Sequence, residues 1–254
     1  MTDYIVAIPS RLASTRLPNK PLSLVGGVPL IRRVCMQALK SRAQRVIACV
    51  DDEKIAACVE GLDGAEICMT SKEARCGTDR IAEMIKAKNL PCDTVIVNIQ
   101  GDEPLINPEH IDAVAKLLID KQADMATLCF LIDNKEDVFD PSCVKVVFDN
   151  QGYAMYFSRA PIPYERDNFA AGKDPAFPHY HHVGIYAYRA GTVLDYTAWE
   201  QQENELAESL EQLRVLQHGL KIAVGVIGEH PETGVDTPED LERVNRVLAQ
   251  RGEA

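Results

Sequence analysis

A basic loop near the start of the chain has the residue types that bind phosphate groups. Residues 9–21 place Arg11, Arg16 and Lys20 among small residues such as Ser14. Arginine offers a bidentate fork to phosphate oxygens, lysine adds a point charge, and small residues let backbone N–H groups approach an anion. The Walker pattern and the GxGxxG dinucleotide pattern are both absent, so a phosphate site of another kind is predicted. A solvated basic loop without a ligand is the alternative.

Two aspartates, Asp102 and Asp236, have the chemistry of magnesium ligands. Asp102 follows Gly101, which permits a sharp turn at the end of an apolar run, and Asp236 precedes a predicted final helix. Carboxylate oxygens are hard ligands that can hold Mg²⁺ against a triphosphate. Each aspartate also has an ordinary structural explanation: turn chemistry for Asp102, and a favourable charge at a helix N-terminus for Asp236.

Strand and helix patterns alternate in the first half of the chain and place these residues at one edge of a sheet. Apolar runs predict strands over residues 4–9, 45–50, 65–69 and 94–99, and amphipathic runs predict helices over 29–40, 53–60, 78–88 and 108–121. This order predicts a parallel, doubly wound α/β sheet. Ligands of such sheets bind beyond the carboxyl ends of the strands, where the basic loop and Asp102 lie.

The second half of the chain has a different pattern. Strand-like runs over 125–131, 144–148, 153–157 and 183–188 lack crossover helices between them, which predicts antiparallel additions to the sheet. The polar and aromatic stretch 158–182 predicts a protruding arm or lid. A strand over 221–227 and a last helix capped by Thr237, with Asp240 three residues on, complete the pattern. We therefore predict a single domain over residues 1–254, with an insertion at about 140–190.

A helix predicted over 205–218 has two different faces. Leu206, Leu210, Leu213 and Leu216 form an apolar side, and Glu211 and Gln212 fall on an adjacent face. Such a helix could pack in the core and present two polar groups to a hydroxyl-rich ligand. A solvated polar face is the simpler interpretation of the pattern alone.

The overall composition excludes several classes of protein. The chain has 254 residues, 46% of them hydrophobic, and a net charge of −11, which argues against nucleic-acid binding. No run approaches the length of a membrane span, so membrane insertion is not expected. The eight cysteines show no zinc spacing, and we expect reduced thiols in a cytoplasmic protein.

Three histidines, His179, His181 and His182, could suggest a transition-metal site. In an extended segment the first two share a face and the third points the opposite way, so three-point binding is geometrically poor. We therefore do not predict a metal there.

Six segments, taken in order, resemble the motifs of the 3-deoxy-D-manno-octulosonate (Kdo) cytidylyltransferase, or CMP-Kdo synthetase, family. They are residues 9–21, 100–104, 156–163, 184–188, 209–214 and 234–238. The first is shared by many sugar nucleotidyltransferases, whereas the last two are more specific. The resemblance spans about residues 4–248 and implies a nucleotide-diphospho-sugar transferase-like fold.

The resemblance implies a reaction, a cofactor and a set of site residues. The reaction is CTP + Kdo → CMP-Kdo + pyrophosphate, for lipopolysaccharide biosynthesis, in a cytoplasmic homodimer that pairs through the arm region. The residues implied for the nucleotide phosphates are Arg11, Ser14, Arg16 and Lys20, and those near cytosine are Arg75, Gly77, Thr78 and Gln100. Those implied for the sugar are Arg159, His182, Tyr186, Glu211 and Gln212. Asp102 and Asp236 would hold Mg²⁺, and with Arg16 and Lys20 they would carry the catalysis.

Alternatives to this function stay open at the level of sequence. The same transfer to 8-amino-Kdo would use the same motifs, whereas sialic-acid enzymes usually differ in the first loop. A nucleotide-sensing homologue without activity is a further alternative, against which the retention of both aspartates argues. The chain also departs from the family pattern at Ser10, Leu12, Asn19 and Cys76, and the last replaces a usual serine. Cys76 is therefore the thiol whose reactivity should be tested first.

Overall fold

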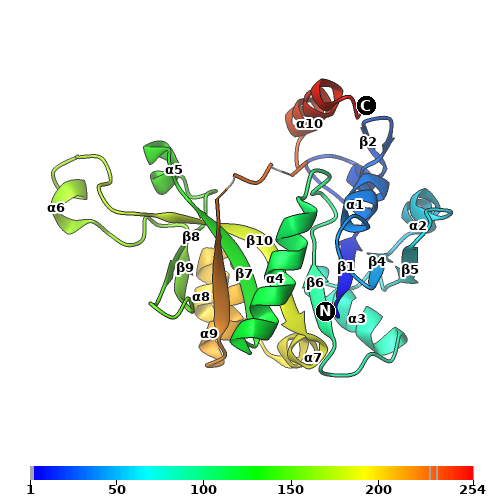
Figure 1. The fold of residues 1–254 in the computed structure, drawn as a ribbon, viewed down its shortest axis with the longest axis horizontal. Coiled ribbons are helices and arrows are strands. Elements are labelled where there is room, and N and C mark those ends of the chain that lie inside the picture. Colours follow the sequence, from blue (N-terminus) through cyan, green and yellow to red (C-terminus); the bar gives the residue numbers. More distant parts are fainter. Residues whose placement is uncertain (1–2, 229, 233, 254) are drawn as a thin grey trace.

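A nine-stranded sheet forms the centre of the computed structural model, which describes residues 3–228, 230–232 and 234–253 (Figure 1). Its main path runs in the order β11-β7-β10-β6-β1-β4-β5, and β8 and β9 extend it beside β10. The strands are β1 (Ile5–Ser10), β4 (Arg45–Val50), β5 (Ala65–Met69), β6 (Val95–Asn98), β7 (Met125–Leu131), β8 (Lys145–Phe148), β9 (Ala154–Ser158), β10 (Tyr180–Arg189) and β11 (Ile222–Ile227). A separate hairpin pairs β2 (Leu24–Val25) with β3 (Val28–Pro29).

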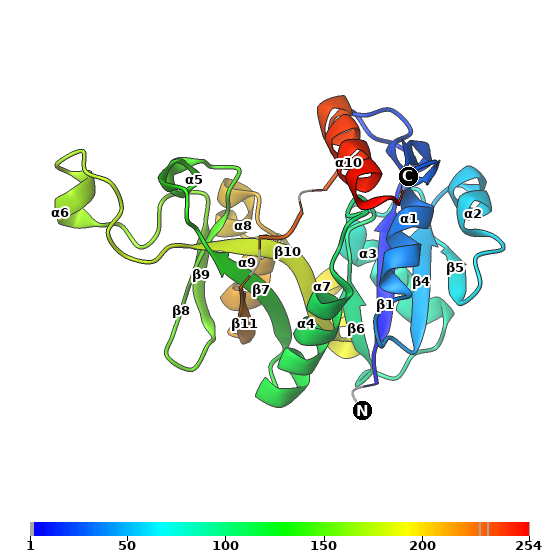
Figure 2. The ribbon, with the colours of Figure 1, turned by 45° about the horizontal axis from the view of Figure 1, so that its top comes forward.

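Most of the helices lie on the two faces of the sheet, whereas α6 lies on a protruding segment, as Figure 2 shows from a second direction. They are η1 (Lys20–Leu22), α1 (Leu30–Ala38), α2 (Glu53–Val59), α3 (Gly77–Ala87), α4 (Pro108–Lys121), α5 (Lys135–Phe139), α6 (Arg166–Phe169), α7 (Ala190–Ala198), α8 (Glu203–Glu208), α9 (Gln212–Gln217) and α10 (Pro238–Arg251). One core packs α1, α2, α4 and α10 against the sheet, and the other packs α3, α7 and α9. Among the described helices, none is long and apolar enough to cross a membrane.

The first half of the chain forms the parallel part of the sheet, and the predicted doubly wound order is confirmed. β1 pairs in parallel with β4 and β6, and β4 pairs in parallel with β5. Neighbouring residues of β1 alternate between the two cores, with Val6 and Ile8 in one and Ile5 and Ala7 in the other. Burial on both faces explains why this strand reads as a continuous apolar run.

The second half adds the predicted antiparallel strands. β10 lies between β6 and β7 and is antiparallel to both, and β8 and β9 form an antiparallel pair beside it. β10 begins at Tyr180, three residues before the predicted start. Residues 159–179 protrude from the sheet as an arm with α6 near its end (Figure 1). The sequence pattern missed α7, which packs against α3.

The prediction of one continuous helix over 205–218 is wrong, because this segment forms the two short helices α8 and α9. Ser209 adopts a left-handed conformation with φ 52° and ends α8, and Leu210 then turns into the core before α9 begins. Leu206, which the leucine pattern places on the buried apolar side, is 58% exposed. A buried ion pair between Glu205 and Arg214 holds the two short helices together. The break places Glu211 and Gln212 at the start of α9 and not on the side of a longer helix.

The last helix begins as predicted. The Thr237 hydroxyl accepts a hydrogen bond from the Asp240 backbone N–H, and the Asp240 carboxylate accepts one from the Thr237 N–H. This capping box satisfies two N–H groups that have no partner inside the helix. It fixes where the chain enters α10, immediately after Asp236.

Candidate active site

Three loops that are distant in sequence meet at the carboxyl edge of the parallel strands. They are the loop after β1, the turn after β6, and residues 234–236 before α10. The Val235 N–H donates to the Asp102 carbonyl at 2.8 Å, which joins the last two. A Cβ on Gly234 would lie 2.9 Å from that same carbonyl, so only glycine permits this approach.

Gly101 lies in the predicted turn after β6, where the Glu103 N–H donates to the Gln100 carbonyl at 3.2 Å. Gly101 does not adopt a positive φ, but a Cβ at this position would lie 2.8 Å from the Pro9 carbonyl oxygen and 3.2 Å from Ser10 Cβ. Glycine is required here because the turn after β6 packs directly against the end of β1. The two loops thereby hold their side chains at one site.

One lysine bridges the two predicted metal ligands. Lys20 Nζ lies 2.6 Å from Asp102 Oδ2 and 2.9 Å from Asp236 Oδ1, and Arg16 Nη2 lies 3.0 Å from Asp236 Oδ1. Burial alone would lower the pKa of Lys20, but the two carboxylates outweigh it and raise that pKa. The ammonium therefore stays charged at neutral pH.

The two carboxylates fit a divalent cation. Their oxygens lie around a single cationic atom, Lys20 Nζ, so they already face one position that favours positive charge. Within the described ranges, no group of three or more His, Cys, Asp or Glu side chains shares a possible metal position. Magnesium commonly takes one or two protein carboxylates and completes its shell with water and phosphate oxygens. The donor set thus suits a magnesium–nucleotide complex.

A cavity of about 420 Å³ opens around these charged side chains, and we call it the charged cavity. It is lined by nearly all the residues predicted for the nucleotide and the metal: Arg11, Ser14, Arg16, Lys20, Arg75, Gly77, Gln100, Asp102 and Asp236. The two arginines of the first loop, Arg11 and Arg16, are exposed. Cations in an open cavity can meet a polyanionic ligand without first being taken out of water.

A buried ion pair between Asp51 and Arg80, which the sequence pattern did not predict, stabilises the wall of the charged cavity. Asp51 accepts from the Leu12 backbone N–H at 2.9 Å and from Arg80 Nη2 at 2.8 Å. Arg80 also donates to the Thr70 hydroxyl at 2.9 Å. One carboxylate therefore ties the basic loop to α3. Asp51 directly follows β4, so the strand-end argument that found Asp102 could also have found it.

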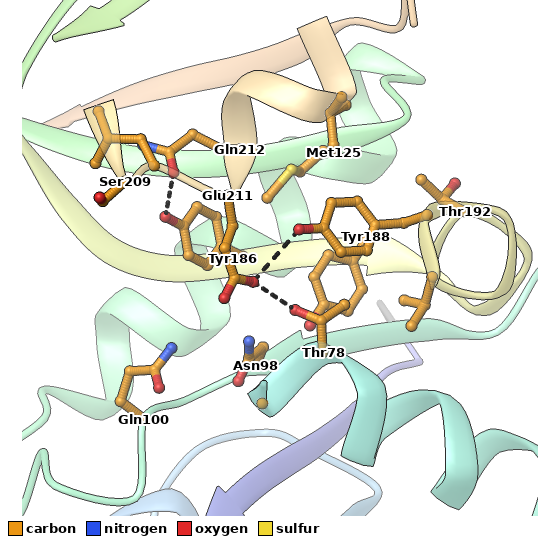
Figure 3. A pocket seen from close by; sticks show the side chains of 15 residues that line it. Thr78, Asn98, Gln100, Met125, Tyr186, Tyr188, Thr192, Ser209, Glu211 and Gln212 are labelled. Carbon is orange, nitrogen blue, oxygen red and sulfur yellow. Dashed lines mark hydrogen bonds between the residues drawn. The ribbon is translucent and has the colours of Figure 1, made fainter. Parts of the chain in front are cut away.

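A second cavity, of about 260 Å³, adjoins the first, and we call it the tyrosine cavity (Figure 3). Its lining includes Thr78, Tyr186, Glu211 and Gln212 of the predicted site, together with Asn98, Tyr188 and Tyr196, which were not predicted. Gly77, Gln100 and Glu211 line both cavities. A ligand that reaches from one cavity into the other must pass these three residues.

Hydrogen bonds at the mouth of the tyrosine cavity fix the two polar side chains at the start of α9. Glu211 Oε2 accepts from the Thr78 hydroxyl at 3.2 Å and from the Tyr196 hydroxyl at 3.5 Å. Gln212 Oε1 accepts from the Tyr186 hydroxyl at 3.4 Å. Glu211 keeps access to solvent, yet the protein around its carboxyl group removes enough water to raise its pKa.

Comparisons with known proteins agree with this geometry. A family model described as Cytidylyltransferase matches residues 5–222. The 3-deoxy-manno-octulosonate cytidylyltransferases of Aliivibrio fischeri and Vibrio cholerae are 51% and 50% identical to the chain over 249 and 252 residues. These alignments cover 98% and 99% of this chain and 100% of each relative. The chain belongs to the 3-deoxy-manno-octulosonate cytidylyltransferase family.

A solved structure of the same kind shares the fold of this cytidylyltransferase. It is a CMP:2-keto-3-deoxy-manno-octonic acid synthetase complexed with CTP, with a TM-score of 0.89 and 36% sequence identity. The alignment covers 98% of this chain and 99% of that one. The predicted α/β architecture with antiparallel additions is therefore shared with a CTP-binding relative.

Two residues predicted for the sugar of a cytidylyltransferase, Arg159 and His182, line neither cavity. Arg159 donates to the Glu208 carbonyl at 2.6 Å and to the Pro141 carbonyl at 2.9 Å. His182 is buried in β10, where its Nε2 lies 3.0 Å from the Thr127 hydroxyl, and burial lowers its pKa to about 3. Its ring packs 5.4 Å from that of Tyr186. Each residue contacts elements that form the cavity and not the cavity itself.

The surroundings of Cys76 do not favour a reactive thiol. This cysteine lies just before α3 and lines the charged cavity. Partial burial, and to a lesser degree the charge of Glu211, raise the pKa of Cys76 to about 11. Little thiolate forms at neutral pH as a result. All eight cysteines are free thiols.

Proposed function

We propose that this chain transfers the cytidylyl group of CTP to the anomeric hydroxyl of Kdo and releases pyrophosphate, as the names of its relatives state for them. The observation that carries the proposal is the junction of two unlike cavities: one is lined by several cations paired with carboxylates, and the other is lined mainly by uncharged polar and apolar groups and has Glu211 at its mouth. A nucleoside triphosphate suits the first and a polyhydroxylated sugar the second. The shared residues between them mark where the two substrates would react.

The charged cavity supplies the groups that a triphosphate needs. Arg11 and Arg16 are exposed on the loop after β1 and can turn toward phosphate oxygens. Lys20 is held between two carboxylates, so its charge becomes available to phosphate when those carboxylates take another cation. We propose that this exchange is part of nucleotide binding.

Asp102 and Asp236 are the residues that we propose to hold Mg²⁺. When bound to a triphosphate, the ion withdraws charge from the phosphates and helps to orient them. The two side chains come from the turn after β6 and from the segment before α10, which the Val235–Asp102 backbone hydrogen bond joins. This connection keeps both carboxylates on the same side of the site.

The reaction that we propose is a direct displacement. The anomeric hydroxyl oxygen of the sugar forms a bond to the α-phosphorus, and the bond from that phosphorus to the bridging oxygen of pyrophosphate breaks. The hydroxyl proton passes to solvent water in the open cavity, and the electron pair of the broken bond leaves with pyrophosphate. Arg16 and Lys20 stabilise this charge, and the cavities hold the two reactants in line, so no Cys or Ser nucleophile is needed.

The choice of acceptor can be tested directly. The names of the relatives favour Kdo over 8-amino-Kdo or another acidic sugar. Purified protein should be mixed with CTP, Mg²⁺ and each sugar, and pyrophosphate release measured. Release with Kdo well above the release with the other sugars supports the proposal, whereas background release with Kdo contradicts it. Omission of Mg²⁺ with chelator present should abolish the reaction.

We also propose a cytoplasmic homodimer that pairs through the arm and participates in lipopolysaccharide biosynthesis. The arm exposes Tyr164 and Phe177, and Phe139 of α5 is exposed beside Phe169 of α6, with ring centroids 4.9 Å apart. Large exposed aromatic groups favour a protein contact. Eight free thiols suit a reducing compartment. Light scattering on the intact protein, compared with the variant Phe177→Asp, tests the assembly: the variant should become monomeric.

A further inference from the structure

The floor of the tyrosine cavity contains polar atoms that the protein leaves without partners. Asn98 Oδ1, Tyr188 Oη and Gln212 Nε2 are buried and have no hydrogen-bond partner among the described residues. Asn98 is 4% and Tyr188 5% exposed. A buried polar group without a partner costs free energy, so three around one cavity indicate a ligand that supplies the missing bonds.

The sheet itself places Asn98 and Tyr188 on the same face. Asn98 of β6 pairs with Tyr186 of β10, and Tyr188 lies two residues further along β10. Residues opposite each other in an antiparallel pair, and residues two apart on a strand, point to the same side of a sheet. The floor of the cavity therefore belongs to central strands of the sheet and not to loops.

Asn98 and Tyr188 are neighbours, but they do not satisfy each other. Burial raises the pKa of Tyr188 well above its ordinary value, and the Asn98 side chain offsets part of that rise. Within the part of the chain that the structure describes, no hydrogen bond of normal geometry uses Asn98 Oδ1 or the Tyr188 hydroxyl. Figure 3 shows both side chains beside the cavity, together with Gln212.

The charges of the two cavities orient the acceptor sugar. Of the described residues that line the tyrosine cavity, none is Lys, Arg or His, and the carboxylate of Glu211 lies at its mouth. A sugar carboxylate would be repelled there. In a 2-keto-3-deoxy sugar acid the carboxylate and the reacting hydroxyl are on the same anomeric carbon. That end must face the charged cavity, so the hydroxylated tail is the part that enters the tyrosine cavity.

We infer that Asn98 and Tyr188 bind the tail hydroxyls of the acceptor sugar and are specificity-determining residues of the tyrosine cavity. The inference rests on the proposed function and adds to it the orientation of the sugar. A hydroxyl group both donates and accepts, so it can satisfy an amide oxygen and a phenol together. A tail that lacks hydroxyls would leave these atoms unpaired, and such a site rejects it strongly.

The decisive variant is Tyr188→Phe, which removes only the unpartnered hydroxyl. We expect the Kdo KM to rise about 5- to 10-fold, which is the effect of losing one ordinary hydrogen bond to the sugar. The kcat and the CTP KM should stay within about twofold, because a group that binds ground state and transition state equally affects KM alone. The melting temperature should stay or rise, because no internal hydrogen bond is lost. Tyr153→Phe is the matched control, since its hydroxyl donates to the Lys121 carbonyl, outside both cavities.

A shortened acceptor completes the test. A 3-deoxy-2-ulosonic acid without the terminal carbons of Kdo should have a raised KM with the wild type, and Tyr188→Phe should add little to that rise. An unchanged Kdo KM in Tyr188→Phe overturns the inference, as does a rise confined to the CTP KM or a lower melting temperature without a change of KM. Absence of activity in the wild type would instead contradict the proposed function.

Discussion

The charged cavity is made of loops, whereas the tyrosine cavity is made of strands and helix ends, although the two share Gly77, Gln100 and Glu211. In the first, cations and carboxylates already pair with one another, as Lys20 does with Asp102. In the second, buried polar atoms such as Asn98 Oδ1 have no hydrogen-bond partner among the residues described. The charged cavity can therefore exchange ion pairs when an anion arrives, and the tyrosine cavity must gain its missing hydrogen bonds from a neutral polar group. The difference suggests that charge binds one substrate and hydroxyl geometry selects the other.

The largest expected effect follows from breaking the charged cavity alone. Asp102→Asn removes one of the two proposed metal carboxylates, and turnover should fall about 10³-fold at saturating substrates. Because the side chain is partly exposed, the free energy of unfolding should change by less than about 1 kcal/mol. Steady-state pyrophosphate release and chemical denaturation measure the two quantities. Asp174→Asn, on the exposed arm, is the control, and near-normal turnover of Asp102→Asn at saturating Mg²⁺ would refute the assignment.

The second largest effect is expected from breaking the buried Asp51–Arg80 ion pair beside the charged cavity. Asp51→Ala leaves the buried Arg80 guanidinium without its carboxylate and frees the Leu12 N–H, so it should cost about 3–5 kcal/mol of stability. The surviving folded protein should also bind CTP more weakly because the basic loop loses its anchor. Denaturant unfolding and the CTP KM check both parts. Asp52→Ala, at the next position, removes the N-cap of α2 and a surface ion pair with Lys72 and should cost less. Equal losses for the two variants would contradict the proposed role of Asp51 as the anchor of the basic loop.

The mouth of the tyrosine cavity is expected to respond more selectively. Glu211→Ala removes the acceptor of the Thr78 and Tyr196 hydroxyls and should raise the Kdo KM about 10-fold or more, with a smaller rise in the CTP KM. Initial rates with each substrate varied in turn distinguish the two constants. Glu203→Ala, exposed on α8, serves as the control. Equal changes in both constants would indicate a structural role for Glu211.

The smallest expected effect is a pH dependence of stability from the same carboxyl group. Desolvation raises the pKa of Glu211 above its ordinary value of 4.5 in the folded protein, so folding favours the protonated form. This contribution is complete below that ordinary value and is lost as the pH rises through the raised pKa. The melting temperature of the wild type, relative to Glu211→Gln, should therefore decrease from pH 4 to pH 8. A difference that is flat or increases with pH would show that the pKa is not raised.

The residues of the charged cavity could be predicted from the sequence because they lie directly beside the predicted strands and the last helix. Ligands of a parallel sheet bind beyond the carboxyl ends of its strands, so residues at those positions are natural candidates. Lys20, Asp102 and Asp236 were singled out from their places relative to β1, β6 and α10, and the structure brings them within hydrogen-bond distance. Asp51 obeys the same rule and was missed only because its neighbours carry no phosphate-binding pattern. The parallel half of the sheet was predictable for a related reason, since burial on both faces leaves continuous apolar runs.

The tyrosine cavity was much less predictable. Asn98 and Tyr188 lie inside strands that read as core, and nothing local reveals that their polar atoms have no partner. The break between α8 and α9 has no glycine or proline at the left-handed residue, Ser209, so leucine periodicity alone predicted one helix. Long-range contacts, such as the Glu205–Arg214 ion pair and the hydrogen bonds of Arg159 to α8, stabilise the break.

The backbone hydrogen bond from Val235 to Asp102 also has a consequence for the order in which the enzyme is made. Lys20 and Asp102 are synthesised before Asp236, which lies 134 residues after Asp102 in the chain. A nascent chain can fold its parallel sheet and basic loop while its second carboxylate is still missing. The site is completed only when the segment before α10 folds back onto the turn after β6. A protein cut short before Gly234 would keep most of its core and lack the charge pattern of the finished site.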